Sequence, residues 1–211
     1  MKYKDVIQID MDMYFETLSK YIDRYQKINI FEIGSRDGKD ARKLSSLYPN
    51  STVYAFEASP LEYQNHIEEN SNINWINLAI YDREEELEFN IKGYLSGVHS
   101  FRNKTNLGGT KIKVLAKRMD NFCKENNIVS IDIVKLDVEG CSYEVLKSFG
   151  EFLPNVMAFH LETERVEYFE NQILEDDVFK LLEKDFIMVE KNTRPDVHQS
   201  DSIWINKKLV K

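Results

Sequence analysis

The sequence is poor in the features that mark several classes of protein. Its 211 residues include only two cysteines, Cys123 and Cys141, which form neither a metal-type pair nor a disulfide framework. No apolar run approaches the roughly 20 residues of a membrane span, and the first residues lack the apolar segment of a secretory signal. Lys and Arg number 28 against 36 Asp and Glu, for a formal net charge of −8. We therefore expect a cytoplasmic protein whose partner is neither nucleic acid nor a membrane; its oligomeric state is left open.

The rest of the composition is that of an ordinary globular protein, with 42% hydrophobic and 30% charged residues. A chain of this length can bury one full core. Without a visible domain boundary, we expect a single domain over residues 1–211. Residues 1–27 contain helical spacing and predict a leading helix that packs on a sheet or covers a ligand cleft.

Apolar strand-like runs alternate with helical patterns along most of the chain, which predicts an α/β fold. The expected architecture is a Rossmann-like, mostly parallel seven-stranded sheet with helices on both faces and an antiparallel strand pair at the C-terminus. Strands are expected at residues 28–33, 52–57, 73–80, 131–136, 156–161, 186–189 and 202–205, and helices at 39–47, after Ser59, through 143–149 and at 173–182.

The middle of the chain has a different character. Residues 87–91 and 111–115 alternate between apolar and polar side chains, which is typical of an antiparallel strand pair. The Gly/Ser/Asn-rich stretch between them, residues 93–109, is expected to be a mobile substrate loop. Candidate substrate contacts within it are Ser96, His99, Ser100 and Arg102, although a solvated loop histidine is an equal alternative for His99.

A polar turn, Gly34-Ser35-Arg36-Asp37-Gly38, follows the first expected strand, where open α/β sheets bind nucleotide-like ligands. A dinucleotide fingerprint needs glycine where this chain has Arg36 and Lys39, which weakens an NAD site. S-adenosylmethionine is the alternative. Its ammonium suits Glu32, its carboxylate suits the N–H groups around Gly34 and Gly38, and a ribose suits Glu57 at the end of the second strand.

Several motifs, taken in order, resemble those of the FkbM-type methyltransferases, which use S-adenosylmethionine and have a Rossmann-like class I fold. They are Phe31-Glu32-Ile33-Gly34, Ala55-Phe56-Glu57-Ala58-Ser59-Pro60, Asn77-Leu78-Ala79, Met119-Asp120-Asn121-Phe122 and Ile133-Val134-Lys135-Leu136-Asp137-Val138-Glu139-Gly140. One departure is that the asparagine of the family's first loop is replaced by Arg36. The resemblance implies a cofactor site that includes Glu32, Gly34, Ser35, Arg36, Asp37, Gly38, Glu57, Ala58, Ala79 and Asp137, with Asp82 as a further adenine contact or a turn residue.

Methyl transfer needs donor and acceptor to be aligned, and a hydroxyl acceptor benefits from a nearby base. Asp137 is the first candidate for this base, and Glu139 is a candidate to share its role. His160, Glu162 and Glu164 follow the fifth strand; with Asp137 they could ligate a divalent metal, although solvated or capping acids are the favoured interpretation. His160 is a candidate base or a hydrogen-bonded structural histidine.

The predicted function is S-adenosylmethionine-dependent methylation of a small-molecule or sugar hydroxyl. The alternatives are an NAD-dependent oxidoreductase and a methyltransferase-like binding module without turnover. Three aromatic residues are either core residues or contacts of the acceptor: Tyr143, Tyr168 and Phe169. Asp120 is expected to cap or anchor the short helix expected at residues 118–126.

Overall fold

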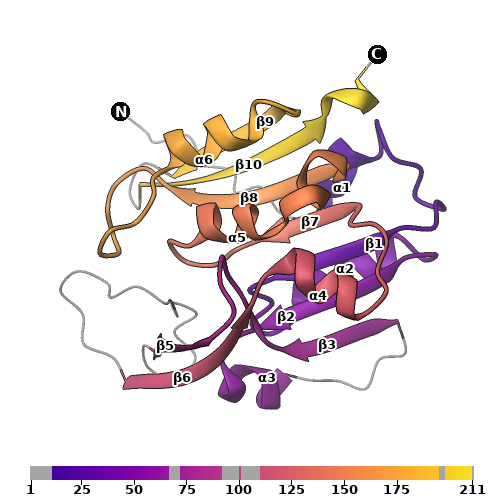
Figure 1. Ribbon diagram of the computed structural model, residues 1–211. Coiled ribbons are helices and arrows are strands. Elements are labelled where there is room, and N and C mark those ends of the chain that lie inside the picture. The colour runs from indigo at the N-terminus through magenta and orange to yellow at the C-terminus, as the bar shows by residue number, and fades with distance from the viewer. Residues whose placement is uncertain (1–10, 67–71, 92–99, 101–109, 195–197, 211) are drawn as a thin grey trace, which may run out of the picture.

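The computed structural model describes residues 11–66, 72–91, 100, 110–194 and 198–210 (Figure 1). Its main sheet has seven strands in the order β3-β2-β1-β7-β8-β10-β9. The bounds are β1 Asn29–Ile33, β2 Thr52–Glu57, β3 Ile73–Asn77, β7 Ile133–Leu136, β8 Ala158–Glu164, β9 Phe186–Arg194 and β10 Gln199–Asn206. Only β10 runs against its neighbours, pairing antiparallel with both β8 and β9. The predicted fold is confirmed.

Helices cover both faces of this sheet, as Figure 1 shows. The helices are α1 Met11–Leu18, α2 Lys39–Leu47, α3 Pro60–His66, α4 Met119–Glu125, α5 Ser142–Ser148 and α6 Glu175–Leu182, with 3₁₀ turns at Gly150–Asn155 and Lys207–Leu209. Alternate residues of β7 point to opposite faces. Ile133 joins the apolar cluster of α1 and α2, while Val134 and Leu136 join the larger cluster of α4, α5 and α6. None of the described helices is long and apolar enough to cross a membrane.

The leading helix, α1, is shorter than its apolar spacing predicts and packs on the sheet. It ends at Leu18, and Asp23 then accepts a hydrogen bond from the Tyr25 N–H at 2.9 Å, a local turn that competes with helix. Tyr14 is fully buried, and its hydroxyl donates to the Val134 carbonyl oxygen at 3.2 Å. Of the two expected positions for this helix, the structure shows packing against the sheet.

A second, three-stranded sheet follows β3 and has the order β4-β6-β5. Its strands are β4 Ala79–Ile80, β5 Glu86–Ile91 and β6 Thr110–Lys117. The antiparallel pairing of β5 with β6 confirms the expected strand pair. The expected strand at residues 73–80 is divided, because Ala79 and Ile80 pair with β6. Ser96, His99 and Arg102, and most of the expected substrate loop, lie outside the described residues.

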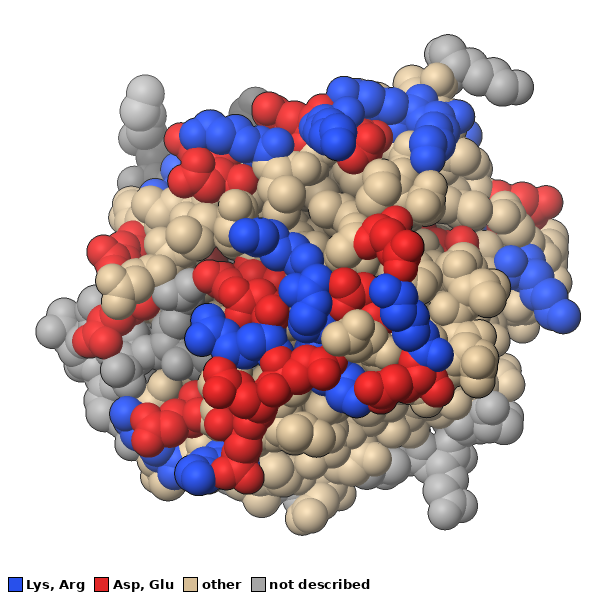
Figure 2. All heavy atoms as spheres, in the orientation of Figure 1, with Lys and Arg blue, Asp and Glu red and all other residues tan. Residues whose placement is uncertain are grey.

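The outer face of this smaller sheet is charged. Ion pairs cross it between Glu86 and Lys113 at 2.8 Å and between Glu88 and Lys111 at 2.9 Å. Figure 2 shows acidic and basic side chains mixed over this side of the molecule. Exposed pairs of this kind contribute little to stability, because solvent and salt screen them. The alternation of polar and apolar residues in β5 and β6 thus matters mainly because it sets which face of this strand pair is buried.

The two cysteines are free thiols in different apolar clusters. Cys123 is fully buried in the cluster of the main sheet, and Cys141 is buried in the cluster of the smaller sheet. Burial raises the pKa of the Cys123 thiol to about 12. The thiol of Cys123 is therefore protonated at neutral pH.

Candidate functional site

The turn after β1 and the end of β7 are in direct contact. Gly34 has φ of 85°, and a Cβ on it would lie 1.8 Å from the Asp137 carbonyl oxygen. The Asp137 N–H donates to the Ile33 carbonyl oxygen at 3.0 Å. Only glycine allows both this conformation and this approach. The first turn is thereby held against the candidate base.

The amides of the first turn are used within the protein. The Gly34 and Ser35 N–H groups donate to the Phe56 carbonyl oxygen at 3.0 and 2.9 Å, and the Gly38 N–H donates to the Ser35 carbonyl oxygen at 2.6 Å. We expected the N–H groups around Gly34 and Gly38 to bind a ligand carboxylate. In this structure the Gly34 and Ser35 amides fasten the turn to β2, the Gly38 amide closes the turn on itself, and the two glycines supply left-handed φ angles and space.

Arg36 also has a left-handed φ, at 45°, and its side chain is exposed. Its N–H donates to Glu57 Oε2 at 2.8 Å. Asparagine tolerates this conformation better than other residues with a side chain. The geometry explains why asparagine is usual at this position in the family that the sequence resembles. Next to it, burial raises the pKa of the Asp37 carboxyl, but hydrogen bonds from Lys39 outweigh burial and lower it overall.

Glu57 ends β2 with both carboxylate oxygens fixed. Oε2 accepts the Arg36 N–H, and Oε1 accepts the Ser59 N–H at 2.7 Å. The side chain is only 7% exposed. Burial raises its pKa, opposed by the two amides. Each oxygen keeps a second lone pair that can accept a hydroxyl.

The two alanines of the expected cofactor site, of which Ala79 was expected to contact the adenine, lie at the cluster under the smaller sheet. Ala79 is buried in this cluster, and Ala58 is partly buried against it. Asp82, a further candidate, is half-buried and accepts from Arg83 at 2.9 Å, while its carbonyl accepts from Arg118 at 3.1 Å. These contacts fit a turn residue.

Glu32 lies on β1, buried to 2% exposure, and its Oε2 has no hydrogen-bond partner. Burial raises its pKa to about 8, although Lys135 and the Ala41 amide act in the opposite direction. An unpaired acidic oxygen in a buried position is costly unless another group satisfies it. The side chain is thus suited to a cationic partner.

Lys135 is a site residue that the sequence analysis did not single out. It pairs in register with Glu32, and its Nζ lies 3.0 Å from Asp40 Oδ2 and 3.4 Å from Asp137 Oδ2. Burial alone would lower its pKa, but the carboxylates of Asp137, Glu32 and Asp40 outweigh this and raise it. A lysine inside an otherwise apolar four-residue strand, two residues before an acid, was the available signal.

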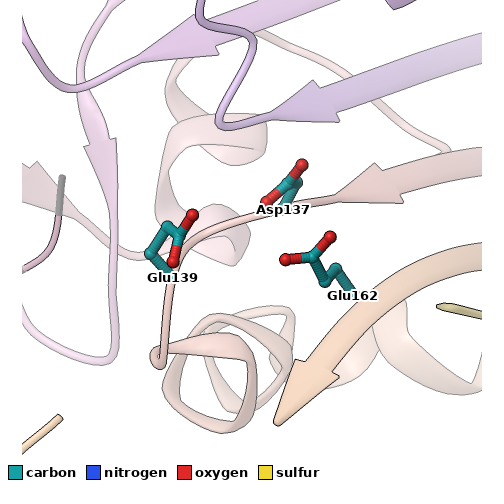
Figure 3. A group of neighbouring side chains, drawn as sticks. All are labelled: Asp137, Glu139 and Glu162. Atoms are coloured by element: carbon teal, nitrogen blue, oxygen red, sulfur yellow. The ribbon is translucent and has the colours of Figure 1, made fainter. Parts of the chain in front are cut away.

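Three carboxylates gather beyond the ends of β7 and β8. One oxygen from each of Asp137, Glu139 and Glu162 lies within 4.8 Å of the others. Figure 3 shows the three side chains converging from the turn after β7 and from β8. Such oxygens could ligate a divalent cation or accept hydrogen bonds from hydroxyls. The structure brings Asp137 and Glu139 together, and the role that they are expected to share stays a prediction.

Glu164, one of the candidate metal ligands that the sequence offers, is not part of this group. Its Oε1 accepts the Gly140 N–H at 3.1 Å, and its Oε2 accepts the Gln172 side-chain amide at 2.6 Å. Glu162 takes the place beside Asp137, and its Oε1 accepts from Gln199 at 2.8 Å.

His160 is also outside the carboxylate group. It is 4% exposed, its ring centroid lies 5.0 Å from that of Tyr14 on α1, and its Nε2 is 3.6 Å from Asp201 Oδ1. Neither ring nitrogen has a hydrogen-bond partner among the described residues, so the hydrogen bond expected of a structural histidine is not seen.

Two of the aromatic residues considered as acceptor contacts are packed inside the protein. Tyr143 packs against the main core, and Phe169 is 2% exposed and touches the position that a Gly140 Cβ would occupy. Asp120 accepts two hydrogen bonds from Arg118, at 3.0 and 2.7 Å, and one from the Asn121 N–H, which confirms its anchoring role.

The strand order and the single reversed strand define the class I methyltransferase fold. Two solved structures with this fold are a putative sarcosine dimethylglycine methyltransferase from Galdieria sulphuraria and fibrillarin from Methanococcus jannaschii. The first has a TM-score of 0.55 at 9% identity, covering 92% of this chain and 84% of its own. The second has a TM-score of 0.53 at 14% identity, covering 98% and 86%.

The match to the Methyltransferase FkbM domain extends over residues 32–198, and the chain belongs to this family. A relative is the 2-O-methyltransferase NoeI of Sinorhizobium fredii (strain NBRC 101917 / NGR234), 28% identical over 163 residues, which are 68% of this chain. The match covers 66% of that relative, slightly less than two thirds of its length.

Proposed function

We propose that this protein is an S-adenosylmethionine-dependent methyltransferase that methylates a hydroxyl of a small molecule or sugar. Membership of the FkbM family supports the reaction class. The NoeI relative is named a 2-O-methyltransferase, which supports oxygen as the methylated atom.

The observation that carries the proposal is the fixed carboxylate of Glu57. Two backbone amides orient it at the carboxyl end of β2, beside the turn after β1. This is the place where a nucleoside binds in an open α/β sheet, and a carboxylate there can accept both ribose hydroxyls. Glu57 is therefore assigned to the ribose, with Ala58 and Ala79 near the base.

The amino-acid end of the cofactor is assigned to Glu32 and the first turn. The unpartnered Oε2 of Glu32 would gain an ammonium donor. Residues Gly34, Ser35, Arg36, Asp37 and Gly38 shape the wall through their backbone, because Gly34 lies directly against Asp137. The residues present thus fit the cofactor.

The acceptor is assigned to the three carboxylates. The cofactor supplies a methyl group on a sulfonium, already activated for displacement. Asp137, Glu139 and Glu162 are placed to accept a hydrogen bond from the acceptor hydroxyl and then its proton, as the new C–O bond forms and the S–C bond breaks. The Lys135 ammonium, 3.4 Å from Asp137 Oδ2, orients that carboxylate.

Calorimetry with S-adenosylhomocysteine tests the cofactor assignment. We expect the wild type to bind and Glu57→Gln to bind roughly tenfold more weakly or worse, because one acceptor of a charged hydrogen-bond pair becomes a donor. The control is Asp132→Asn, another buried carboxylate that accepts a backbone amide, from Asn29 at the amino-terminal end of β1. Absence of binding by the wild type, or equal binding by Glu57→Gln, would refute the assignment.

Transfer of tritiated methyl from S-adenosylmethionine to a panel of methyl glycosides and simple alcohols tests the reaction. We expect one hydroxyl class to be labelled, and Asp137→Asn to slow transfer by roughly 10²-fold or more. Binding of S-adenosylhomocysteine without transfer to any acceptor would instead favour a binding module.

A further inference from the structure

The peptide unit that joins Glu139 to Gly140 is held at both of its polar atoms by side chains. Ser100 Oγ donates to the Glu139 carbonyl oxygen at 2.6 Å. The Gly140 N–H donates to Glu164 Oε1 at 3.1 Å. The two holding residues come from opposite sides of the turn after β7, so the peptide plane is fixed between them.

Ser100 is buried and is hydrogen-bonded through its backbone. It is 3% exposed, and it exchanges two backbone hydrogen bonds with Asn90 of β5, at 2.8 and 3.2 Å. Its hydroxyl also lies 3.7 Å from Cys141 Sγ. Ser100 therefore adds a hydrogen bond to the apolar contacts that Val138 and Cys141 make with the smaller sheet.

Glu164 is oriented by a directional partner. It is 4% exposed, and its Oε2 accepts from Gln172 Nε2 at 2.6 Å. Gln172 Oε1 accepts the Tyr168 and Phe169 N–H groups at 3.0 and 3.2 Å. Because those amides fix which end of the Gln172 side chain donates, Gln172 can only present N–H to Glu164.

The held peptide imposes an unfavourable conformation on Glu139. Its φ is 44°, and that of Gly140 is 81°. A left-handed φ disfavours a residue with a Cβ, and such residues persist where surrounding contacts enforce them. The result is that the Glu139 carboxylate turns toward Asp137 and Glu162 (Figure 3).

We propose that Ser100 and Glu164 are positioning residues for the acceptor: by holding the Glu139–Gly140 peptide, they set the Glu139 carboxylate within the three-carboxylate group. The inference rests on the proposed role of that group. It assigns the buried Glu164 a function through Glu139, and it links the smaller sheet to the acceptor site.

The test begins with NMR on the full-length protein, with and without S-adenosylhomocysteine. In Glu164→Gln, the new amide cannot accept from both Gly140 and Gln172, so one of the two bonds is lost. We expect the Gly140 amide to exchange roughly tenfold faster or more, the scale of a lost charged hydrogen bond. In Ser100→Ala, we expect the carbonyl ¹³C signal of Glu139 to move. The double variant Glu164→Gln with Gln172→Glu restores the pairing with the donor reversed, and we expect the Gly140 exchange rate to return to that of the wild type.

The functional readout is the separation of acceptor and cofactor effects. With the acceptor found in the glycoside panel, both single variants are expected to lose roughly tenfold or more in kcat/KM. The Kd of S-adenosylhomocysteine should be unchanged. The double variant should recover the activity that Glu164→Gln loses. Unchanged Glu139 and Gly140 signals in both single variants would overturn the inference. So would a failure of the double variant to recover, or a parallel loss of cofactor affinity. If the panel yields no acceptor, the O-methylation proposal fails, and the NMR signals still decide whether the peptide is held as inferred.

Discussion

Arg36 illustrates how a single residue can depart from its family's pattern and keep the local geometry. Its backbone takes the left-handed φ of 45°, and its N–H still donates to Glu57. The contact to Glu57 is made by the backbone, so any residue that accepts this φ can make it. The departure therefore costs conformational energy and leaves the contact intact.

We predict that Arg36→Asn stabilises the protein by about 1 kcal/mol, because asparagine visits left-handed φ more readily. Urea unfolding should show a higher midpoint with an unchanged slope, and S-adenosylhomocysteine affinity should be retained. Lys27→Asn, also at an exposed position but without a left-handed φ, is the control. A less stable Arg36→Asn would show that the side chain matters more than the backbone.

Glu32 predicts a pH dependence of stability. Its folded-state pKa is about 8, against an ordinary value of 4.5. Between these values the unfolded state has lost the proton and the folded state keeps it, so stability falls as pH rises from about 5 and levels off above about 8. The difference in unfolding free energy between wild type and Glu32→Gln should narrow or change sign over this window.

A flat difference between pH 5 and 8 would show that Glu32 is ionised in the folded protein. Calorimetry supplies an independent check in buffers of different ionisation enthalpy. If an ammonium binds beside Glu32, S-adenosylhomocysteine binding near pH 7 should release protons in the wild type and fewer in Glu32→Gln.

At the scale of elements, helices could be predicted where residues at their own ends supply the start and stop signals. The predicted helix at residues 39–47 matches α2, which Gly38 and Pro49 bracket. Ser59 caps α3 as expected, accepting the Glu62 N–H at 3.3 Å, with Pro60 in the first position. Continuous apolar runs also identified β1 and β7 as buried strands, and β-branched and aromatic residues identified β2.

Features decided by distant contacts could not be predicted from local patterns. Periodicity extended the leading helix to Tyr25, but α1 ends at Leu18 and turns follow it. The run at residues 73–80 is divided because Ala79 pairs with Ala116, far along the chain. Glu164 was grouped with Glu162 on strand alternation, whereas its partners are Gly140 and Gln172. In the sequence, Lys135 lies within an apolar strand, and nothing local shows that the fold surrounds it with three carboxylates.

At the scale of the whole molecule, the candidate site residues gather at the carboxyl-terminal ends of the parallel strands. The main sheet presents the ends of β1, β2 and β7 on the same side, because these strands are parallel neighbours. The smaller sheet approaches that edge through Ser100 and the turn after β7. At the amino-terminal ends of the strands, contacts such as that of Asp132 with the Asn29 N–H join neighbouring strands. Substitutions at the two edges should therefore separate into functional and stability effects.

The two buried thiols make the protein its own reporter of partial unfolding. Cys123 samples the core of the main sheet, and Cys141 samples that of the smaller sheet. With a thiol-specific reagent under native conditions, modification requires opening, so each rate converts to a local opening free energy. We predict that Cys141, measured in Cys123→Ala, is modified at lower urea than Cys123 in Cys141→Ala. Equal rates at every urea concentration would instead mean that both sheets open together, as one cooperative unit.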